Sequence, residues 1–491
     1  MALRIGMFSW ESMHSIAIGG LAPHATELAA GLSRRGHEVH VFTRMGEGQS
    51  RYDCVDGVHY HRCPFESHSD FLTLIARMND SFTWHFAEAE HFMGRPFDVV
   101  HGHDWLSVGA LRQTKNRHGR PTVLTIHSTE FGRCGNCHWE DSMSRSIRDL
   151  EWEGAYIANQ VICVSRALSR EVQEQYGVPA DKVAAIYNGV HPRRYDAHVD
   201  VREVRHRHRI GLDDPCVLFA GRLTWQKGPD LLVEAVPAVL DDHPQAKIVF
   251  AGDGDMRAGL ESRVASMGII GSTRFLGHRN GFDLISLFKT TDVVCVPSRN
   301  EPFGIVILEA WSAMKPVVAT RIGGPEEFVR DDYNGLKVTP DSESIGRGLC
   351  RMLADPDGIE EMGRNGRHEA ESRFSWDQAA EQTEQVYRAV LLETESAQKG
   401  NSLSVSGGGP KIMGKHMAKP GTVQLKKTTT TGPKVELGTD GGPTHEEITR
   451  RAYGIFLARN ERTGDPVTDW LQAERELRAE KSRGSDPAKR G

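Results

Sequence analysis

PSRNEPFGIVILEA, residues 297–310, links an apolar β-strand to a helix and is the most informative stretch of the chain. Its two glutamates stand eight residues apart, so Glu301 lies in the loop before the helix and Glu309 about one turn inside it. The backbone N–H groups of Gly304 and Ile305 begin the helix, where they point at any anion bound in front of it. A strand, a ligand-facing loop and a helix in this order form the repeating unit of a doubly wound α/β sheet.

The same alternation of strand and helix extends over most of the chain. Short β-branched runs followed by amphipathic stretches predict parallel sheets covered by helices. A polar stretch rich in Arg and His, near residues 191–213, divides the alternation into two parts. The strands expected in the first part are Leu3–Phe8, Glu38–Thr43, Phe97–His101, Pro121–His127, Gln160–Val164 and Lys182–Tyr187. Those expected in the second part are Cys216–Ala220, Lys247–Ala251, Thr273–Leu276, Asp292–Pro297, Pro316–Thr320 and Gly335–Val338.

These patterns predict an α/β protein with two Rossmann-like domains that face a cleft, because 491 residues exceed what one hydrophobic core usually organises. The first domain is expected at residues 1–190 and the second at residues 191–374. An amphipathic helix at 375–394 is expected to cross back to the first domain. The composition of 395–443, rich in Gly, Ser, Thr, Pro and Lys, predicts a disordered, flexible linker, and 444–480 predicts a small α-hairpin.

The C-terminal hairpin is predicted from a capping box, Thr444 with Glu447, ahead of apolar residues at helical spacing. So short a hairpin cannot bury a sufficient core alone, and we expect it to dock on another surface or to self-associate. The linker before it carries seven lysines between Lys399 and Lys434. Contact of these lysines with anionic lipid or RNA is the alternative to a solvated tether, which is the interpretation we favour.

Charge and hydropathy argue against several classes of function. The chain has 60 basic and 66 acidic residues, a formal charge of −6, so no globally basic surface indicates nucleic acid as a partner. No apolar run approaches the roughly 20 residues that span a bilayer, and the N-terminus lacks the pattern of a signal peptide. We therefore expect a cytoplasmic protein without a transmembrane segment. The eight scattered cysteines favour buried, reduced thiols.

In the first domain, three polar segments follow expected strands. Gly19 and Gly20 precede a helix and let the backbone approach a phosphate, although a tight turn is the simpler interpretation. The segment HGHDW contains Asp104, and TIHS contains His127. Both follow strands whose carboxyl ends face the ligand crevice of a doubly wound sheet. Catalytic and helix-capping roles are equally compatible with such side chains.

The second domain opens with FAGRLTWQKG, residues 219–228, a strand end that leads into a helix. Arg222 and Lys227 are two cations at this strand end, where they could stabilise a diphosphate as it leaves a substrate. A solvated surface pair is the alternative.

At these residues the chain resembles glycosyltransferase family four, whose members have the GT-B fold. GRLTWQKG and PSRNEPFGIVILEA resemble the signature segments of that family. HGHDW and TIH, with the Gly-Gly loop, are similar to the glycogen and starch synthase branch, and the resemblance spans roughly residues 3–392. It implies that the phosphates of a nucleotide-sugar donor meet Arg222 and Lys227, that the ribose meets Glu309 and that the transferred sugar meets Glu301.

In the first domain, the resemblance implies that His127 lies beside the reacting sugar, that Asp104 shapes its pocket and that the paired glycines line the phosphates. The residues expected to be catalytic are His127, Arg222, Lys227 and Glu301. Those expected to bind the donor are Gly19, Gly20, Asp104, Gly304, Ile305 and Glu309.

The family resemblance implies transfer of a hexose, with glucose as the first expectation, from a nucleotide sugar to a sugar or glucan acceptor. It implies retention of the anomeric configuration without a metal or other cofactor. The chain departs from bacterial glycogen synthases at Ala17, where those enzymes carry a lysine. Two alternatives are a sugar-nucleotide epimerase, which shares the architecture, and a sugar-binding regulator without catalysis.

Two other motifs are interpreted structurally. Asp253-Gly254-Asp255 spells a D-x-D sequence between a strand and a helix, where turn and N-cap roles are favoured over manganese binding. Cys134 and Cys137 precede His138 in a C-x-x-C-H pattern. Haem attachment requires export and zinc requires further ligands, so a loop with two thiols near the site is expected, with a reversible disulfide as the alternative.

Overall fold

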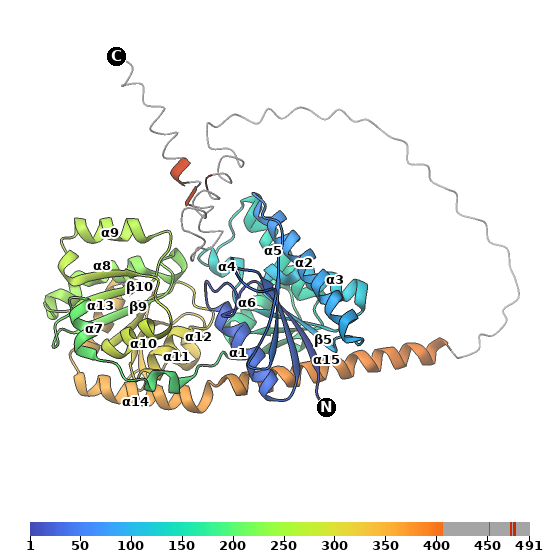
Figure 1. The fold of residues 1–491 in the computed structure, drawn as a ribbon. Coiled ribbons are helices and arrows are strands. Elements are labelled where there is room, and N and C mark those ends of the chain that lie inside the picture. The colour runs from blue at the N-terminus through green and yellow to red at the C-terminus, as the bar shows by residue number, and fades with distance from the viewer. Residues whose placement is uncertain (406–450, 452–471, 474, 478–491) are drawn as a thin grey trace, which may run out of the picture.

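The computed structural model describes residues 1–405, 451, 472–473 and 475–477, and within them the predicted α/β fold class is confirmed. Two domains lie side by side, each built on a largely parallel sheet packed between helices (Figure 1). Every expected strand is present, with boundaries that match or shift by one or two residues.

The sheet of the first domain has eight strands in the order β3-β4-β2-β1-β5-β6-β7-β8. Its strands are β1 (Arg4–Ser9), β2 (Glu38–Arg44), β3 (Tyr52–Val55), β4 (Val58–Cys63), β5 (Val99–His103), β6 (Thr122–Ile126), β7 (Gln160–Cys163) and β8 (Val183–Ala185). Its helices are α1 (Leu21–Arg34), α2 (Phe71–Met93), α3 (Val108–His118), α4 (Glu130–Arg133), α5 (Ser142–Ile157) and α6 (Arg166–Tyr176).

The central strand β1 is buried along its whole length. Gly6 in this strand allows α2 to pack closely, because a Cβ there would lie 2.9 Å from the Phe86 ring. Strands β3 and β4 form an antiparallel hairpin that the sequence did not predict. Because β3 lies at the sheet edge with mostly exposed side chains, it lacks the apolar run that marks a buried strand.

The sheet of the second domain has six parallel strands in the order β11-β10-β9-β12-β13-β14. Its strands are β9 (Cys216–Ala220), β10 (Lys247–Ala251), β11 (Thr273–Gly277), β12 (Val293–Val296), β13 (Val317–Thr320) and β14 (Gly335–Val338). Its helices are α7 (Val201–Arg207), α8 (Pro229–Asp242), α9 (Arg257–Ser266), α10 (Gly281–Thr290), α11 (Ile305–Ser312), α12 (Gly324–Phe328), α13 (Ser342–Leu353) and α14 (Pro356–Arg373).

Helix α15 (Trp376–Val405) follows the second domain and packs against α1 of the first (Figure 1). The two helices approach closely at Gly31, where a Cβ would lie 2.9 Å from that of Ala380. The helix continues to residue 405, so the first part of the segment predicted as linker is helical. Most of that segment and of the predicted hairpin lies outside the described residues.

The two domains also meet through hydrogen bonds. A carboxylate oxygen of Glu327, on α12, accepts from the backbone N–H of Ala167 at 2.5 Å, at the start of α6. Its other oxygen accepts from the hydroxyl of Tyr187 at 2.6 Å. A side chain of the second domain thus caps a helix of the first. Among the described helices, none is long and apolar enough to cross a membrane.

Candidate active site

The predicted site residues come from loops at the carboxyl ends of strands in both domains. Gly20 caps α1 in the first domain, and Gly304, with a left-handed φ of 94°, caps α11 in the second. A Cβ on Gly20 would lie 3.7 Å from Cδ1 of Ile305. The glycine loop of one domain therefore faces the start of a helix in the other, and both offer backbone N–H groups to an anion.

Lys227 and Glu301 form a direct ion pair, although 74 residues separate them in the sequence. The Nζ atom of Lys227 lies 2.7 Å from Oε2 and 2.9 Å from Oε1 of Glu301. Glu301 is buried, and the Ser298 hydroxyl also donates to its carboxylate at 2.9 Å. The cation expected to bind phosphate thus neutralises the carboxylate expected to bind sugar, so an anionic ligand would compete for Lys227.

Glu309 lies one turn inside α11, as predicted, and is partly buried. Burial raises the pKa of its carboxyl to about 7, and a hydrogen bond from the Tyr195 hydroxyl, 3.2 Å from Oε1, opposes this shift. A carboxyl group in this state can accept hydrogen bonds from ligand hydroxyls that enter the site.

We expect Glu309 to make the free energy of unfolding fall as the pH rises. Its pKa is about 7 in the folded chain against an ordinary value of 4.5, so the contribution is fully present below the lower value. This contribution to the free energy of unfolding, up to about 3 kcal/mol, is lost as the pH rises through the higher pKa. Thermal unfolding of the wild type and of Glu309→Gln should therefore diverge between pH values of about 5 and 8.

The exposed Glu361→Gln variant is the matched control for this measurement. Its pH profile should follow that of the wild type, because its side chain is in solvent. Parallel profiles for Glu309→Gln and the wild type would show that solvent reaches the Glu309 carboxyl.

Asp104 and His127 lie side by side at the ends of β5 and β6. Oδ1 of Asp104 accepts from the backbone N–H of His127 at 2.7 Å. Burial raises the pKa of Asp104 to about 6, although the guanidinium of Arg133 opposes the shift. Asp104 has φ 56° and ψ 175°, a backbone region that L residues rarely adopt, and such strain is concentrated at functional sites. The side chain therefore holds the loop that presents His127.

Two residues near the predicted groups were not identified from the sequence. Oε2 of Glu11, which follows β1, accepts from the backbone N–H groups of Ile18 at 2.9 Å and Gly19 at 2.8 Å. Burial raises the pKa of this carboxyl, and Arg222 is close enough to lower it. The second missed residue, His24 on α1, packs edge to face on His127 with ring centroids 4.4 Å apart. An acidic residue directly after β1 was the available signal for Glu11.

The C-x-x-C loop after α4 meets the second domain, next to the predicted site. Asn136 in this loop accepts from Nδ2 of Asn300 at 2.8 Å. A Cβ on Gly135 would lie 3.0 Å from Nε1 of Trp225.

Cys134 is buried and burial raises its pKa to about 12, whereas Cys137 is exposed. The expectation of buried thiols is wrong for Cys137, because the loop presents it to solvent; it is also wrong for Cys54, which is exposed on edge strand β3, and for Cys350, which is partly exposed.

In the D-x-D segment, Asp253 accepts from the backbone of Gly254 at 2.9 Å and pairs with Arg257 at 3.0 Å. These contacts are those of a turn. The predicted N-cap role is wrong, because Met256 precedes α9 and no side chain caps the helix. Asp255 pairs with Arg475 of the C-terminal segment at 3.0 Å.

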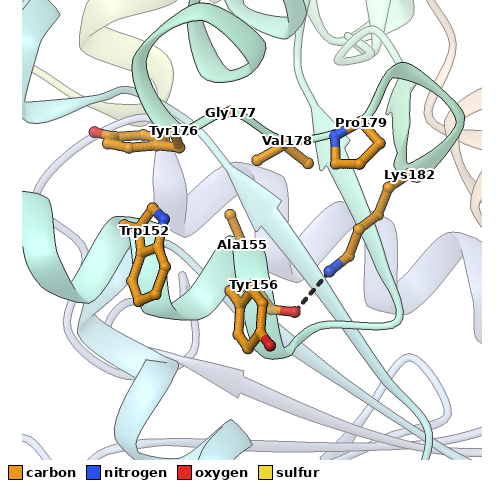
Figure 2. A pocket seen from close by; sticks show the side chains of 8 residues that line it. All are labelled: Trp152, Ala155, Tyr156, Tyr176, Gly177, Val178, Pro179 and Lys182. Atoms are coloured by element: carbon orange, nitrogen blue, oxygen red, sulfur yellow. Dashed lines mark hydrogen bonds between the residues drawn. The ribbon is translucent and has the colours of Figure 1, made fainter.

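A separate hollow of about 110 Å³ lies on the first domain between α5 and the end of α6 (Figure 2). Trp152 and Tyr156 stack in parallel at its edge with ring centroids 5.4 Å apart. None of the predicted site residues lines it, so it is distinct from the site between the domains.

Each of the two domains matches a known protein family. Residues 18–194 match the family described as Glycosyltransferase Family 4, and residues 200–369 match Glycosyl transferases group 1. Residues 443–479 match a family described as a protein of unknown function, DUF2934, and this range corresponds to the predicted hairpin.

The chain is 39% identical over 397 residues to an uncharacterized glycosyltransferase of Methanocaldococcus jannaschii, covering 79% of this chain and 99% of that protein. It is 29% identical over 410 residues to glycogen synthase of Mycobacterium tuberculosis, covering 79% and 95%. Its structure is similar to sucrose-phosphate synthase of Thermosynechococcus elongatus, with a TM-score of 0.67, 22% identity and coverage of 80% and 100%.

Anabaena HepE, solved in complex with UDP-glucose, gives a TM-score of 0.62 at 21% identity, with 80% of this chain and 100% of that chain covered. Sequence motifs, site geometry and these likenesses agree: the chain belongs to glycosyltransferase family four, has the GT-B fold and is similar to the glycogen and starch synthases.

Proposed function

We propose that this protein is a retaining hexosyltransferase that transfers glucose from a nucleotide sugar to a sugar or glucan acceptor. The observation that carries the proposal is the ion pair between Lys227 and Glu301, beside the start of α11 and facing the glycine loop. The names of two similar proteins, a glycogen synthase and a protein solved with UDP-glucose, support glucose as the transferred sugar.

In this proposal, the donor diphosphate lies against Lys227, Arg222 and the N–H groups at the two helix starts. Binding draws Lys227 from Glu301 to the phosphates, and Glu301 is then free to accept hydrogen bonds from the hydroxyls of the sugar. As the bond between the anomeric carbon and the diphosphate lengthens, negative charge grows on the diphosphate, and the two cations beside it stabilise this charge. The ribose hydroxyls donate to Glu309.

His127 acts beside the sugar as a neutral ring, because burial lowers its pKa to about 3. A neutral imidazole has one donor and one acceptor nitrogen, so it can hold a sugar hydroxyl without adding charge. Asp104 supports this role by fixing the backbone of His127.

The test is release of nucleoside diphosphate from a panel of UDP-, ADP- and GDP-sugars, with and without glucose or short glucan acceptors. Release that depends on the acceptor, with an α-linked product from an α-linked donor, is expected. Conversion of the donor to its epimer would indicate the alternative enzyme class. Thermal stabilisation by a donor without any turnover would indicate a regulator that only binds nucleotide sugars.

We expect turnover to survive removal of metal ions with EDTA. Lys227 and Arg222 supply the positive charge that a metal would otherwise bring to the diphosphate. The initial rate after EDTA dialysis should be no lower than the rate before it. Loss of turnover that manganese restores would contradict a metal-independent mechanism and direct attention to Asp253 and Asp255.

A further inference from the structure

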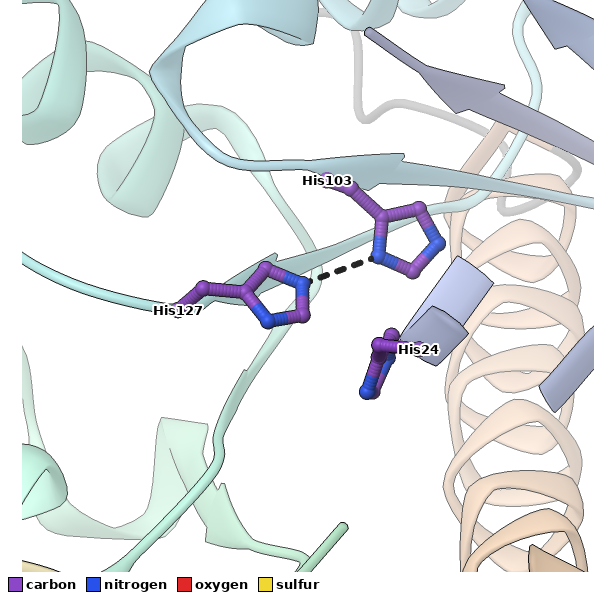
Figure 3. A group of neighbouring side chains, drawn as sticks. All are labelled: His24, His103 and His127. Atoms are coloured by element: carbon purple, nitrogen blue, oxygen red, sulfur yellow. Dashed lines mark hydrogen bonds between the residues drawn. The ribbon is translucent and has the colours of Figure 1, made fainter. Parts of the chain in front are cut away.

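Three histidines from three different elements converge on one point behind the predicted sugar site. His24 comes from α1, His103 ends β5, and His127 follows β6 (Figure 3). One ring nitrogen of each lies within 4.8 Å of one nitrogen of each of the others. His24 and His103 are buried, whereas His127 is partly open.

The hydrogen bonds of this cluster leave nitrogen atoms without partners. Nδ1 of His24 lies 2.7 Å from Oδ1 of Asn188, an acceptor, so it carries the proton and Nε2 has the lone pair. In the described part of the chain, Nε2 of His24 and Nε2 of His103 are buried and have no hydrogen-bond partner. Such groups call for an explanation, because buried polar atoms are nearly always satisfied.

The neighbouring His101 differs from the three histidines of the cluster in its hydrogen bonds. Its Nδ1 lies 2.6 Å from the Tyr387 hydroxyl and its Nε2 lies 2.7 Å from Oγ1 of Thr125. Both ring nitrogens are therefore satisfied, and His101 is a structural residue of the core. Hydrogen bonds therefore satisfy His101 fully, whereas Nε2 of His24, which faces the cluster, has no partner in the described part of the chain.

Two of the three rings have the spacing of ligands on one zinc ion. Zinc binds imidazole nitrogen at about 2.0–2.1 Å, so two ligand nitrogens on a zinc ion are about 3.3 Å apart. Nδ1 of His103 and Nε2 of His127 already lie 3.3 Å apart, which is long for a hydrogen bond. A nitrogen of His24 lies within 4.8 Å of both, so its ring moves closer when all three bind one ion.

The surroundings also fit zinc. A set of three neutral imidazoles suits zinc, cobalt and other late transition metals and does not suit magnesium or calcium, which prefer oxygen. The hydrogen bond from His24 to Asn188 is the outer contact that ligating histidines usually make, since it fixes the ring with its lone pair inward. His127, the most open of the three, leads to the interdomain site and leaves one coordination position for water.

We propose that His24, His103 and His127 form a zinc site, and that zinc bound there inhibits sugar transfer. Inhibition rests on the proposed function, in which the His127 ring faces the reacting sugar. Coordination takes up the lone pair of His127 and holds its ring toward His24 and His103. The metal is thus a regulator of an otherwise metal-independent reaction, and removal of trace zinc with EDTA would raise the rate.

The test of the site itself uses the full chain, freed of metal by EDTA and dialysis, and does not depend on turnover. Titration with Co²⁺ should produce the intense visible absorption of a tetrahedral ion at one equivalent, and Zn²⁺ should abolish it. His24→Gln should remove the absorption. Asn188→Ala, which keeps all three ligands, should weaken Zn²⁺ binding about 10–100-fold in calorimetry.

His61→Gln is the matched control, because His61 also contacts a second histidine, His40, at 2.9 Å in the same domain but outside the cluster. It should bind Co²⁺ like the wild type. Equal Co²⁺ spectra in the wild type and His24→Gln, or an absence of tetrahedral absorption in the wild type, would overturn the zinc site.

Inhibition is tested separately, with each variant normalised to its own metal-free rate. Zn²⁺ should inhibit the wild type and His61→Gln at the concentration that saturates the site, and His24→Gln should resist it. Full turnover by zinc-loaded wild type would refute the inhibitory role while the spectroscopic site stands. If no nucleotide sugar is turned over under any condition, the proposed function fails, and the Co²⁺ spectrum still decides whether the site exists.

Discussion

Lys227→Ala is expected to lower kcat by a factor of about 10²–10³ at saturating donor, with a smaller change in donor affinity. The Lys227 ammonium is held 2.7 Å from Glu301 beside two helix starts, and in the proposed mechanism it shifts from this carboxylate to the diphosphate when the donor binds. Its interaction with the diphosphate strengthens as the diphosphate takes up negative charge. A contact of this kind acts mainly in the transition state and therefore on kcat.

The measurement is a coupled assay of nucleoside diphosphate release over a range of donor concentrations. Lys247→Ala is the matched control, because it removes a lysine of the same domain that pairs with Asp214 at 3.6 Å, away from the predicted site. Its kinetics should equal those of the wild type. Near-normal kcat in Lys227→Ala would refute the phosphate-stabilising role and remove the main physical support for the proposed mechanism.

Lys227→Ala also leaves the buried Glu301 carboxylate without its cation, which could destabilise the domain. The double variant Lys227→Ala/Glu301→Gln removes both charges together. If the double variant regains thermal stability but not turnover, the loss of rate belongs to catalysis. If it regains turnover, the loss in the single variant came from the unpaired carboxylate.

Glu301→Gln is expected to reduce kcat by a factor of similar size, about 10²–10³. In the proposed mechanism, the buried carboxylate lies where bonding to the sugar changes during transfer, and the amide keeps its volume while removing its charge. Glu309→Gln, eight residues further along the same segment, is the natural comparison. Because ribose contacts are similar in the ground and transition states, this change should raise KM and leave kcat within a few-fold.

Both variants are measured in the same donor-titration assay, after their thermal unfolding has been compared with that of the wild type. The separation of the two glutamates is the critical result. Equal effects on KM and kcat in both variants would contradict the separate roles of Glu301 at the sugar and Glu309 at the ribose. A larger kcat effect for Glu309→Gln would reverse the assignment.

Much of the fold was predictable because it depends on local patterns. Buried parallel strands such as Arg4–Ser9 and Val293–Val296 are apolar along their length, so their positions follow from the sequence. The hairpin Tyr52–Cys63 was missed, because half of it is exposed at a sheet edge and has no such run. Helix α15 was predicted too short, since the composition after residue 395 is typical of a linker.

The residues of the candidate site also fall into those that the sequence predicted and those that it missed. Its motif residues were predictable: a glycine pair before a helix, cations after a strand and glutamates around a helix start are short-range patterns with their own chemistry. The sequence alone predicted which loops carry the candidate site, because strand ends in a doubly wound sheet face the ligand. It did not indicate His24, which belongs to no recognised motif and gains importance only from neighbours far along the chain, and the signal for Glu11, an acidic residue after a strand, is weak.

The tertiary structure alone decided the pairings. Lys227 contacts Glu301, His24 contacts Asn188 across 164 residues, and both pairs depend on how two sheets and a crossing helix pack together. The pKa shifts of Glu309 and His127 also depend on the tertiary structure, because burial, and not residue type, sets the free-energy cost of a charged side chain. Sequence patterns report the local preferences of the backbone and its neighbours, whereas contacts, charge states and a three-histidine cluster arise only when distant segments share one buried volume.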